Sequence, residues 1–282
     1  MDALHFDGQV AIVTGAGNGL GRLHALELAR RGARVVVNDV GGSVDGTGTS
    51  ESVADAVVAE ITQAGGEAVA STDSVATPEG GAAIVEAAIA AFGTVDIVVN
   101  NAGILRDAAF KNSTSDLVDP VIDVHLRGAF HVTRPAWNVM SDKGYGRVVI
   151  TSSGSGLFGN FGQSNYGAAK MGLVGLTRVL AIEGARRGIL TNAIAPIART
   201  RMTEAIMGEA GDAYAPELVT PVVVYLAHES CDRNGHIYSV GAGKVNRVFI
   251  GSTRGIEDPS LSPETVAAEI DRIDDVSDWD LR

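Results

Sequence analysis

Residues 10–21, VAIVTGAGNGLG, decide the fold of this chain. The apolar run Val10–Thr14 is typical of a buried strand, and it leads directly into a turn with glycine at 15, 17, 19 and 21. Without Cβ atoms the backbone of such a turn can approach a pyrophosphate closely, and a helix that begins there offers free amides and a positive dipole end. Glycine-rich turns also serve tight packing alone, so the rest of the chain has to distinguish the two interpretations.

The chain repeats the alternation that this unit begins. Short apolar runs, typical of strands buried on both faces, alternate with longer segments of helical periodicity. We predict strands at Val10–Thr14, Arg34–Asn38, Ala68–Ser71, Val95–Asn100, Arg147–Thr151 and Leu190–Ile194. We predict helices near residues 20–31, 53–64, 78–92, 116–142 and 165–187. This order predicts an α/β fold, a doubly wound, Rossmann-like parallel sheet, in a single domain of residues 1–250.

Cap residues and prolines mark several helix ends. Thr77 and Pro78 are typical of an N-cap followed by the first helical position, and Gly93 ends the same helix. Asp119-Pro120 predicts a second start of this kind, and Pro135 predicts a kink in the long helix that follows.

Composition and charge exclude several classes of protein. Of 282 residues, 45% are hydrophobic but only 5% aromatic, so the core must consist mainly of Val, Ala, Leu and Ile. The net charge of −12 argues against general binding of nucleic acid. Cys231 is the only cysteine, which excludes an intrachain disulfide and a multi-thiolate metal site, and we expect no metal. The N-terminus lacks the pattern of a signal peptide and no apolar run reaches the ~20 residues of a membrane span, so we expect a cytoplasmic protein.

Two segments depart from the alternation. Residues 41–52, GGSVDGTGTSES, predict an extended, mobile loop over the adenosine end of a cofactor. Residues 251–282 are acidic and poor in apolar side chains, and Ser262-Pro263 predicts the start of one amphipathic helix that ends near Ile273. We interpret this C-terminal stretch as an extension of the surface and not an independent domain, with a disordered tail as the alternative.

Asp39 strengthens the dinucleotide interpretation of the glycine turn. It ends the second strand at roughly the 20-residue separation from the turn that a ribose-binding acid keeps. Its carboxylate would accept hydrogen bonds from a ribose 2′-hydroxyl and repel a 2′-phosphate, which favours NAD over NADP. The alternatives are a plain turn residue at Asp39, or a 2′-phosphate held by Arg22 or Arg34.

Two more strands end in small or polar residues suited to a ligand. Asp73-Ser74-Val75 follow the third strand, and Asn100-Asn101-Ala102-Gly103 close the fourth. The carboxyl ends of parallel strands meet at one edge of a sheet, where ligands bind beside the switch point. We therefore expect these residues to line one binding site.

Tyr166 and Lys170 are four residues apart, so both side chains lie on one face of the predicted helix. The unperturbed pKa of tyrosine is about 10, and a nearby ammonium favours the phenolate and lowers that pKa towards neutral pH. Ser153 directly follows an apolar strand, where its hydroxyl could bind a substrate oxygen. Together they predict proton transfer to or from an alcohol or carbonyl. Taken alone, the pair is also compatible with a surface tyrosine beside a solvated lysine.

In order and separation these motifs resemble those of the short-chain dehydrogenase/reductase family. The matching elements are TGAGNGLG, NNAG, Ser153 and Tyr166-x-x-x-Lys170, and the resemblance spans roughly residues 6 to 245. Within the family, FDGQVAIVTGAGNGLGR, VVNNAGILRD and GNFGQSNYGAAK are similar to the (3R)-hydroxyacyl-CoA dehydrogenase part of peroxisomal multifunctional enzymes. This resemblance implies oxidation of such thioesters to 3-oxoacyl-CoA with NAD, with some steroid alcohols as further substrates.

The resemblance also implies a role for each matching residue. Tyr166 would be the acid/base, Lys170 would bind the nicotinamide ribose and lower the pKa of Tyr166, and Ser153 would position the substrate oxygen. The residues expected to bind the cofactor are Gly15, Asn18, Gly19, Leu20, Gly21, Asp39, Asp73, Ser74, Val75, Asn101, Ala102, Gly103, Tyr166, Lys170, Pro196, Ile197 and Thr200.

Two positions depart from the family pattern. Many members carry asparagine where this chain has His125, and that asparagine completes a proton relay with the lysine through water. His125 is therefore either a relay member or a buried structural histidine. Ile197 follows Pro196 where the common pattern is Pro-Gly, which can reshape the nicotinamide pocket.

The resemblance makes an NAD-dependent oxidation of (3R)-3-hydroxyacyl-CoA, in lipid or steroid side-chain degradation, the leading hypothesis. The alternatives are a hydroxysteroid or other free secondary-alcohol dehydrogenase and, in a different class, a non-catalytic nucleotide-binding scaffold. CoA is anionic and the chain is acidic, so a CoA ester requires a local basic rim. Candidates for that rim are Arg106, Lys111, Arg199, Arg201 and Arg247.

Family members usually assemble through two long central helices, so the resemblance implies a homodimer or homotetramer. Ala168, Ala169, Gly172 and Gly175 give one of these helices a small-residue surface that suits close packing. Packing of the same surface against the chain's own sheet is the alternative.

Overall fold

The computed structural model describes residues 3–50, 52–200, 203 and 213–281. The chain divides into two compact units, Met1–Asn246 and Arg247–Arg282, and each is described by itself.

The first unit is built on a sheet with strand order β3-β2-β1-β4-β5-β6-β7-β8. The strands are β1 (Val10–Thr14), β2 (Arg34–Asn38), β3 (Glu67–Ser71), β4 (Ile97–Asn100), β5 (Gly146–Thr151), β6 (Ile189–Pro196), β7 (Ile237–Gly241) and β8 (Lys244–Val248). Strands β1 to β7 pair in parallel, which confirms the predicted sheet. The last strand follows β7 through a turn in which both Ala242 (φ 48°) and Gly243 (φ 73°) have positive φ, as two-residue hairpins require.

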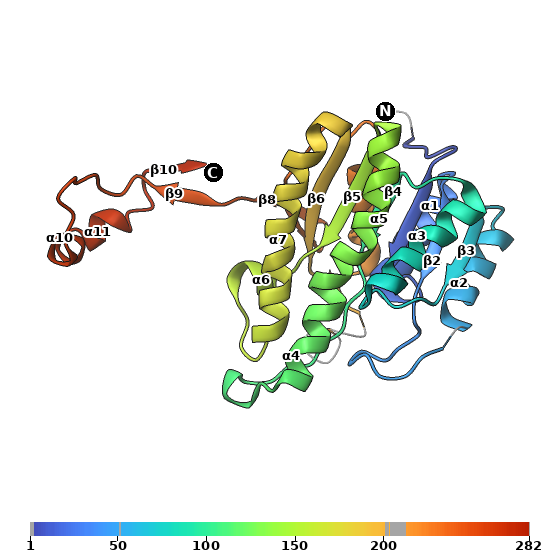
Figure 1. Cartoon of the computed structure of the whole chain (residues 1–282), viewed down its shortest axis with the longest axis horizontal. Helices are drawn as coiled ribbons and strands as arrows, with labels where there is room; N and C mark the ends of the chain where they lie inside the picture. Colours follow the sequence, from blue (N-terminus) through green and yellow to red (C-terminus); the bar gives the residue numbers. More distant parts are fainter. Residues whose placement is uncertain (1–2, 51, 201–202, 204–212, 282) are drawn as a thin grey trace. The chain divides into compact units, whose positions relative to one another are not determined.

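Helices cover both faces of this sheet. On one face α1 (Gly19–Arg30) packs against α2 (Ser52–Gln63) and α9 (Thr220–Ala227), and on the other α3 (Pro78–Phe92) packs against α5 (Gly128–Lys143). Helix α7 (Ser164–Gly184) lies on the same face as α5 in Figure 1. Among the described helices, none is long and apolar enough to cross a membrane.

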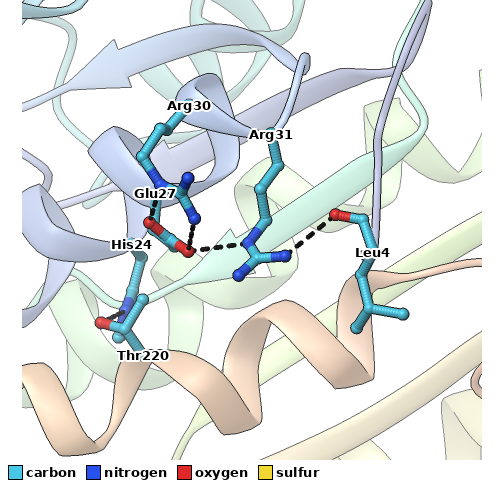
Figure 2. A network of polar contacts seen from close by, with 6 residues as sticks. All are labelled: Leu4, His24, Glu27, Arg30, Arg31 and Thr220. Atoms are coloured by element: carbon cyan, nitrogen blue, oxygen red, sulfur yellow. Dashed lines mark hydrogen bonds and ion pairs between the residues drawn. The ribbon is translucent and has the colours of Figure 1, made fainter. Parts of the chain in front are cut away.

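The helix α1 that follows the glycine turn is held by side chains along its length. The buried ring of His24 contacts the hydroxyl of Thr220, with Nδ1 2.9 Å from Oγ1 (Figure 2). Burial lowers the pKa of His24 to about 3, so this ring is neutral. Further along, Glu27 accepts hydrogen bonds from Arg30 and Arg31, and Arg31 also donates to the carbonyl of Leu4 (Figure 2). These contacts join α1 to the N-terminal segment and to α9.

Helix α3 begins and ends as predicted. The hydroxyl of its N-cap Thr77 accepts a hydrogen bond from the amide of Gly80, Pro78 takes the first helical position, and Gly93 ends the helix in the left-handed conformation.

The segment 116–142, predicted as a short turn followed by a long helix, has three parts. Helix α4 (Ser115–Ile122) is followed by a wide π turn, Asp123–Arg127, and then by α5. The predicted start at Asp119-Pro120 is wrong, because α4 begins at Ser115, five residues before Pro120, with Thr114 as its N-cap. Helix α5 continues through Pro135, and the irregular turn lies before that helix.

The order of the strands places several polar strand ends on one edge. The chain moves outward from β1 to β2 and β3, then returns to the other side of β1 at β4, which makes the β1/β4 boundary the switch point. Since these strands are parallel, Thr14, Asn38, Asn100 and Thr151 end them at the same edge.

Helix α7 uses its small residues in two directions. Ala169 is buried within its own unit, and a Cβ at Gly172 would lie 3.1 Å from the side chain of Leu126. The opposite face is exposed and follows helical spacing; its members are Ala168, Met171, Gly175, Val179 and Ile182. Association of two copies through this face stays a prediction.

The second unit is small. Strands β9 (Gly251–Thr253) and β10 (Trp279–Leu281) form an antiparallel pair, and the ring of Phe249 stacks on Trp279 at 4.9 Å between centroids. Ser262 caps α10 (Pro263–Ala268) as expected, with its hydroxyl accepting from the amide of Thr265. The single helix predicted to extend to Ile273 is wrong, because the chain leaves helical geometry at Glu269 before α11 (Ile270–Ile273) begins.

Candidate active site

The glycine turn after β1 has two positions whose backbone conformation favours glycine. Gly15 and Gly19 have positive φ (64° and 52°), which L side chains rarely adopt. A Cβ at Gly15 would lie 2.8 Å from Cα of Ala102, so the turn packs directly against the segment after β4. A Cβ at Gly19 would meet nothing within 4 Å. The glycine there keeps open a space at the N-terminus of α1 that a side chain would fill.

The turn is joined to the end of β4 by polar contacts. The hydroxyl of Thr14 accepts hydrogen bonds from the amides of Asn101 (3.0 Å) and Ala102 (3.1 Å). The Asn101 side chain donates back to the carbonyls of Thr14 (3.0 Å) and Gly15 (3.2 Å). Gly21 has a different place: a Cβ there would lie 2.2 Å from the Gly15 carbonyl oxygen, so it serves the packing of α1 behind the turn.

Asp39, which directly follows β2, accepts hydrogen bonds from two glycine amides. Its Oδ2 accepts from the amide of Gly17 (2.9 Å) and its Oδ1 from the amide of Gly41 (2.7 Å). A Cβ at Gly17 would lie 2.8 Å from Oδ2, so glycine is needed for this approach. The carboxylate is therefore positioned at the edge of the turn.

These strand ends surround one cleft of about 650 Å³, a volume typical of small-molecule sites. Every residue expected to bind cofactor or act in catalysis lines it except Gly21. Lining residues that the sequence interpretation did not assign include Gly42, Ser43, Val44, Gly46, Ile104, Leu105, Asn160 and Gln163. Among the described residues, no group of three His, Cys, Asp or Glu side chains could hold a metal ion.

Tyr166 and Lys170 stand at the beginning of α7, close to the end of β5. The phenol of Tyr166 lies near enough to the side chain of Ser153 for that hydroxyl to lower its pKa, and Lys170 donates from Nζ to the carbonyl of Thr151 at 2.5 Å. Ser153 also caps the short helix α6 (Gly154–Phe158), because its Oγ accepts from the amide of Ser155 at 3.2 Å. The three predicted catalytic side chains thus converge at one end of the cleft.

The expected effect of Lys170 on Tyr166 is wrong for this structure. Burial raises the pKa of Tyr166 above 10, the nearby hydroxyl of Ser153 opposes this, and the charge of Asp107 raises the pKa further. Burial also lowers the pKa of Lys170 to about 7, so the lysine itself loses much of its charge near neutral pH. Its Nζ lies 5.5 Å from the centre of the Tyr166 ring. Desolvation is the largest cause of both shifts, and Lys170 is not among the groups that shift the pKa of Tyr166.

His125 lies in the π turn between α4 and α5 and is buried. Its Nε2 is 2.8 Å from the carbonyl oxygen and 3.0 Å from the amide nitrogen of Ile104, and which of these bonds forms depends on the tautomer. Its ring meets the Tyr166 ring edge to face at 5.1 Å. Burial, and then the charge of Lys170, lower the pKa of His125 well below its usual 6.5, so the ring is neutral.

A small polar cavity connects His125 with Lys170. Its volume is about 10 Å³, which is the room that one water molecule needs, and Asn100 and Thr151 also line it. The Nδ1 of His125 and the hydroxyl of Thr151 are buried and have no hydrogen-bond partner among the described residues. One ring nitrogen of His125 is thus anchored and the other is not, which is compatible with both alternatives that the sequence left open.

The substrate side of the cleft holds an amide network that sequence reasoning missed. Gln163 donates from Nε2 to Asp107 (2.7 Å), and Asn160 donates to the Gln163 side-chain carbonyl (3.1 Å). Asn165 donates to the carbonyls of Arg106 (2.9 Å) and Leu117 (2.8 Å). The polar residues of this network all stand in the motifs ILRD and GNFGQSNYGAAK, so their clustering around Tyr166 was the available signal.

The candidate basic rim is only partly described. Arg106 lines the cleft but donates to backbone carbonyls, and Lys111 is exposed. The backbone amide of Arg199 donates to the carbonyl of Tyr214 (2.8 Å). Arg201 lies outside the described residues, and Arg247 belongs to the second unit.

Comparison with known proteins assigns this geometry to a family. The model described as short chain dehydrogenase matches residues 9–210. The chain is 53% identical to a short-chain type dehydrogenase/reductase of Mycobacterium tuberculosis over 95% of both chains, and 41% identical to the hydroxyacyl-CoA dehydrogenase ChsB1 of the same organism over 86% of this chain and 80% of that one. The structure of full-length peroxisomal multifunctional enzyme type 2 from Drosophila melanogaster superposes with a TM-score of 0.81 at 41% identity. That match covers 98% of this chain but 47% of the larger enzyme.

Proposed function

This chain belongs to the short-chain dehydrogenase family and is an oxidoreductase, and from this premise we propose that it oxidises (3R)-3-hydroxyacyl-CoA to 3-oxoacyl-CoA with NAD. The observation that carries the proposal is the convergence of Ser153, Tyr166 and Lys170 at one end of a cleft whose other end is the glycine turn. A binding scaffold has no use for three such side chains beside a dinucleotide site.

The residues of the cleft fit a nicotinamide dinucleotide. The open space at Gly19 and the free end of α1 suit a pyrophosphate, because helix amides and the dipole attract anions. The Asp39 carboxylate keeps acceptor capacity beyond its two amide contacts, and its negative charge disfavours a 2′-phosphate, which supports NAD over NADP. Bound NAD would supply the hydride acceptor.

Tyr166 would take the proton of the substrate hydroxyl. The hydroxyl of Ser153 is close enough to the Tyr166 phenol to influence its pKa, so a substrate oxygen placed between them would be held by both hydroxyls. The raised pKa of Tyr166 makes its phenolate a strong base. The proton that Tyr166 takes from the substrate must then leave the site. Its path would run through Lys170 and the small cavity beside Nδ1 of His125, which has no partner among the described residues.

The thioester substrate rests on the names of two relatives. ChsB1 is a hydroxyacyl-CoA dehydrogenase, and the Drosophila protein is a peroxisomal multifunctional enzyme, of which this chain resembles one part. The name of ChsB1 supports a hydroxyacyl-CoA substrate, whereas the (3R) configuration and a lipid or steroid-derived acyl group are what the sequence resemblance implies. A free hydroxysteroid or other secondary alcohol is the competing substrate.

Initial rates on a substrate panel test the proposal. We expect NADH formation with NAD and (3R)-3-hydroxyacyl-CoA esters, a much lower rate with the (3S) esters, and a lower rate with NADP. Activity on free hydroxysteroids alone would contradict the thioester assignment. Binding of NADH without turnover of any secondary alcohol would support the scaffold instead.

A further inference from the structure

The loop that joins β2 to α2 is folded into a closed strap, defined here as residues 40–50 (blue in Figure 1). Its two ends are joined by a hydrogen bond from the amide of Ser50 to the carbonyl of Val40 at 3.0 Å. At Gly41, where φ is 72°, a Cβ would lie 2.1 Å from the carbonyl oxygen of Ser50, so this closure requires glycine. The extended loop expected from the sequence is therefore wrong, because the glycines allow tight turns.

The tip of the strap is organised by Asp45. Its carboxylate accepts hydrogen bonds from the amide (3.1 Å) and hydroxyl (2.8 Å) of Thr47 and from the hydroxyl of Ser43. These bonds lower the pKa of Asp45 to about 2. The amide of Ser43 also donates to the carbonyl of Thr47 at 2.9 Å. The carbonyls of Val44 and Asp45 take no part in these bonds within the strap.

Those two carbonyls meet the segment that follows β4. The amide of Leu105 donates to the carbonyl of Val44 (2.9 Å), and Nε of Arg106 donates to the carbonyl of Asp45 (2.9 Å). Gly46 completes the contact, because a Cβ there would lie 3.1 Å from the Ile104 side chain. Arg106 thus supplies the side-chain hydrogen bond of this junction.

The guanidinium of Arg106 also reaches α4. One of its terminal nitrogens donates to the carbonyl of Asp116 at 2.7 Å. In a regular helix that carbonyl would accept from the residue four positions on, but this residue is Pro120, which has no N–H. The carbonyl of Arg106 in turn accepts from Asn165, the neighbour of Tyr166. Arg106 therefore connects the strap to α4 by its side chain and to α7 by its backbone.

Both partners of this junction line the same cleft as the glycine turn and Tyr166. We propose that the strap encloses the dinucleotide and that Arg106 is the latch that holds it closed, so that exchange of NAD and NADH requires the Arg106 contacts to open. This inference rests on the proposed function for the identity of the ligand. It makes Arg106 a positioning residue, with its guanidinium on two carbonyls and not on the phosphates of CoA.

The latch is tested with Arg106→Ala and Arg106→Lys, with Arg30→Ala as the matched control. Arg30 is an exposed α1 residue whose guanidinium binds Glu27, so its loss removes the same charge away from the cleft (Figure 2). Lysine keeps the charge of Arg106 but lacks the planar fork that reaches two acceptors. We expect both Arg106 variants to release NADH about tenfold faster in stopped-flow fluorescence, since charge-assisted hydrogen bonds are lost, and the control to match the wild type.

Hydrogen exchange of the protein without ligand gives a second readout. The Leu105 amide and residues 42–47 should exchange faster in both Arg106 variants than in the wild type and the control, while the β1 and β5 amides stay protected. Unchanged NADH release in both variants would overturn the proposal, as would a wild-type rate in Arg106→Lys with a raised KM for the CoA ester in Arg106→Ala. If the wild type binds no NADH, the proposed function fails, whereas the exchange comparison still decides whether Arg106 closes the strap.

Discussion

The two ends of the cleft are built from different groups. At the end proposed to hold the dinucleotide, backbone amides, glycines without Cβ atoms and the Asp39 carboxylate shape the space. At the end proposed for catalysis, buried side chains do so, and burial moves the pKa values of Tyr166, Lys170 and His125 away from their ordinary values. In the proposed function, binding depends on backbone shape, whereas chemistry depends on desolvated titratable groups. The two should therefore be separable by substitution.

Tyr166→Phe should break the chemistry and leave the binding. The variant loses the hydroxyl that would accept the substrate proton but keeps the ring that packs against His125. We expect kcat to fall by about 10²–10⁴-fold, the range of general acid–base catalysis, with the Kd for NADH nearly unchanged. Steady-state rates and fluorescence titration measure the two quantities. Retention of most of the rate would show that another group moves the proton.

Gly19→Ala should weaken the binding of the cofactor and leave the chemistry intact. The added methyl group enters the open space at the start of α1 and strains a residue with φ of 52°, so we expect the Kd for NADH to rise about tenfold. Gly93→Ala is the matched control, because Gly93 also has positive φ and open surroundings but ends α3 away from the cleft. Both variants should lose about 1 kcal/mol in the free energy of unfolding. Equal effects of the two substitutions on NADH binding would show that backbone strain, and not the open space at the start of α1, determines the affinity.

Asp39→Asn should sharpen the assignment of the cofactor. Neutralising the carboxylate removes its repulsion of a 2′-phosphate and weakens its acceptance from a ribose hydroxyl. We expect the ratio of kcat/KM for NAD to that for NADP to fall by about tenfold. The amides of Gly17 and Gly41 donate to different oxygens of Asp39, and asparagine keeps only one of them, so one hydrogen bond is lost and the variant should also lose some stability. An unchanged ratio would place the ribose selectivity elsewhere.

Asp107→Asn should produce the smallest change, confined to the pH profile. The negative charge of Asp107 raises the pKa of Tyr166, so removing it lowers that pKa. Because the deprotonated phenol is the proposed base, the rise of kcat/KM for oxidation should move to lower pH. Asp142→Asn, an exposed position near the end of α5, is the control and should leave the profile in place. A shift to higher pH would contradict the assigned electrostatics.

Much of the fold was predictable because its signals are local. Apolar runs, the cap at Thr77 and the stop at Gly93 depend on neighbouring residues, and the parallel sheet follows from their alternation. The divided helix over 116–142 was not predictable in this way, because Pro120 is accommodated inside α4 by a distant arginine that takes the carbonyl it leaves unpaired.

The site was predictable where residue type alone carries the chemistry. The cleft collects Ser153, Tyr166, Lys170 and the turn glycines as expected. Gly21 was misplaced because a glycine needed for packing has the same sequence appearance as one that lines a ligand site. The pKa shifts of Tyr166 and Lys170 could not be predicted, because they depend on how deeply each side chain is buried, and helical spacing does not determine that burial.

The most direct test of the account is the pH dependence of kcat/KM for oxidation, measured with NAD in the wild type and in Tyr166→Phe. The wild-type rate should rise with pH as the Tyr166 phenol loses its proton, and the residual rate of the variant should show no such rise. A rate independent of pH in the wild type, or the same rise in both proteins, would contradict Tyr166 as the base.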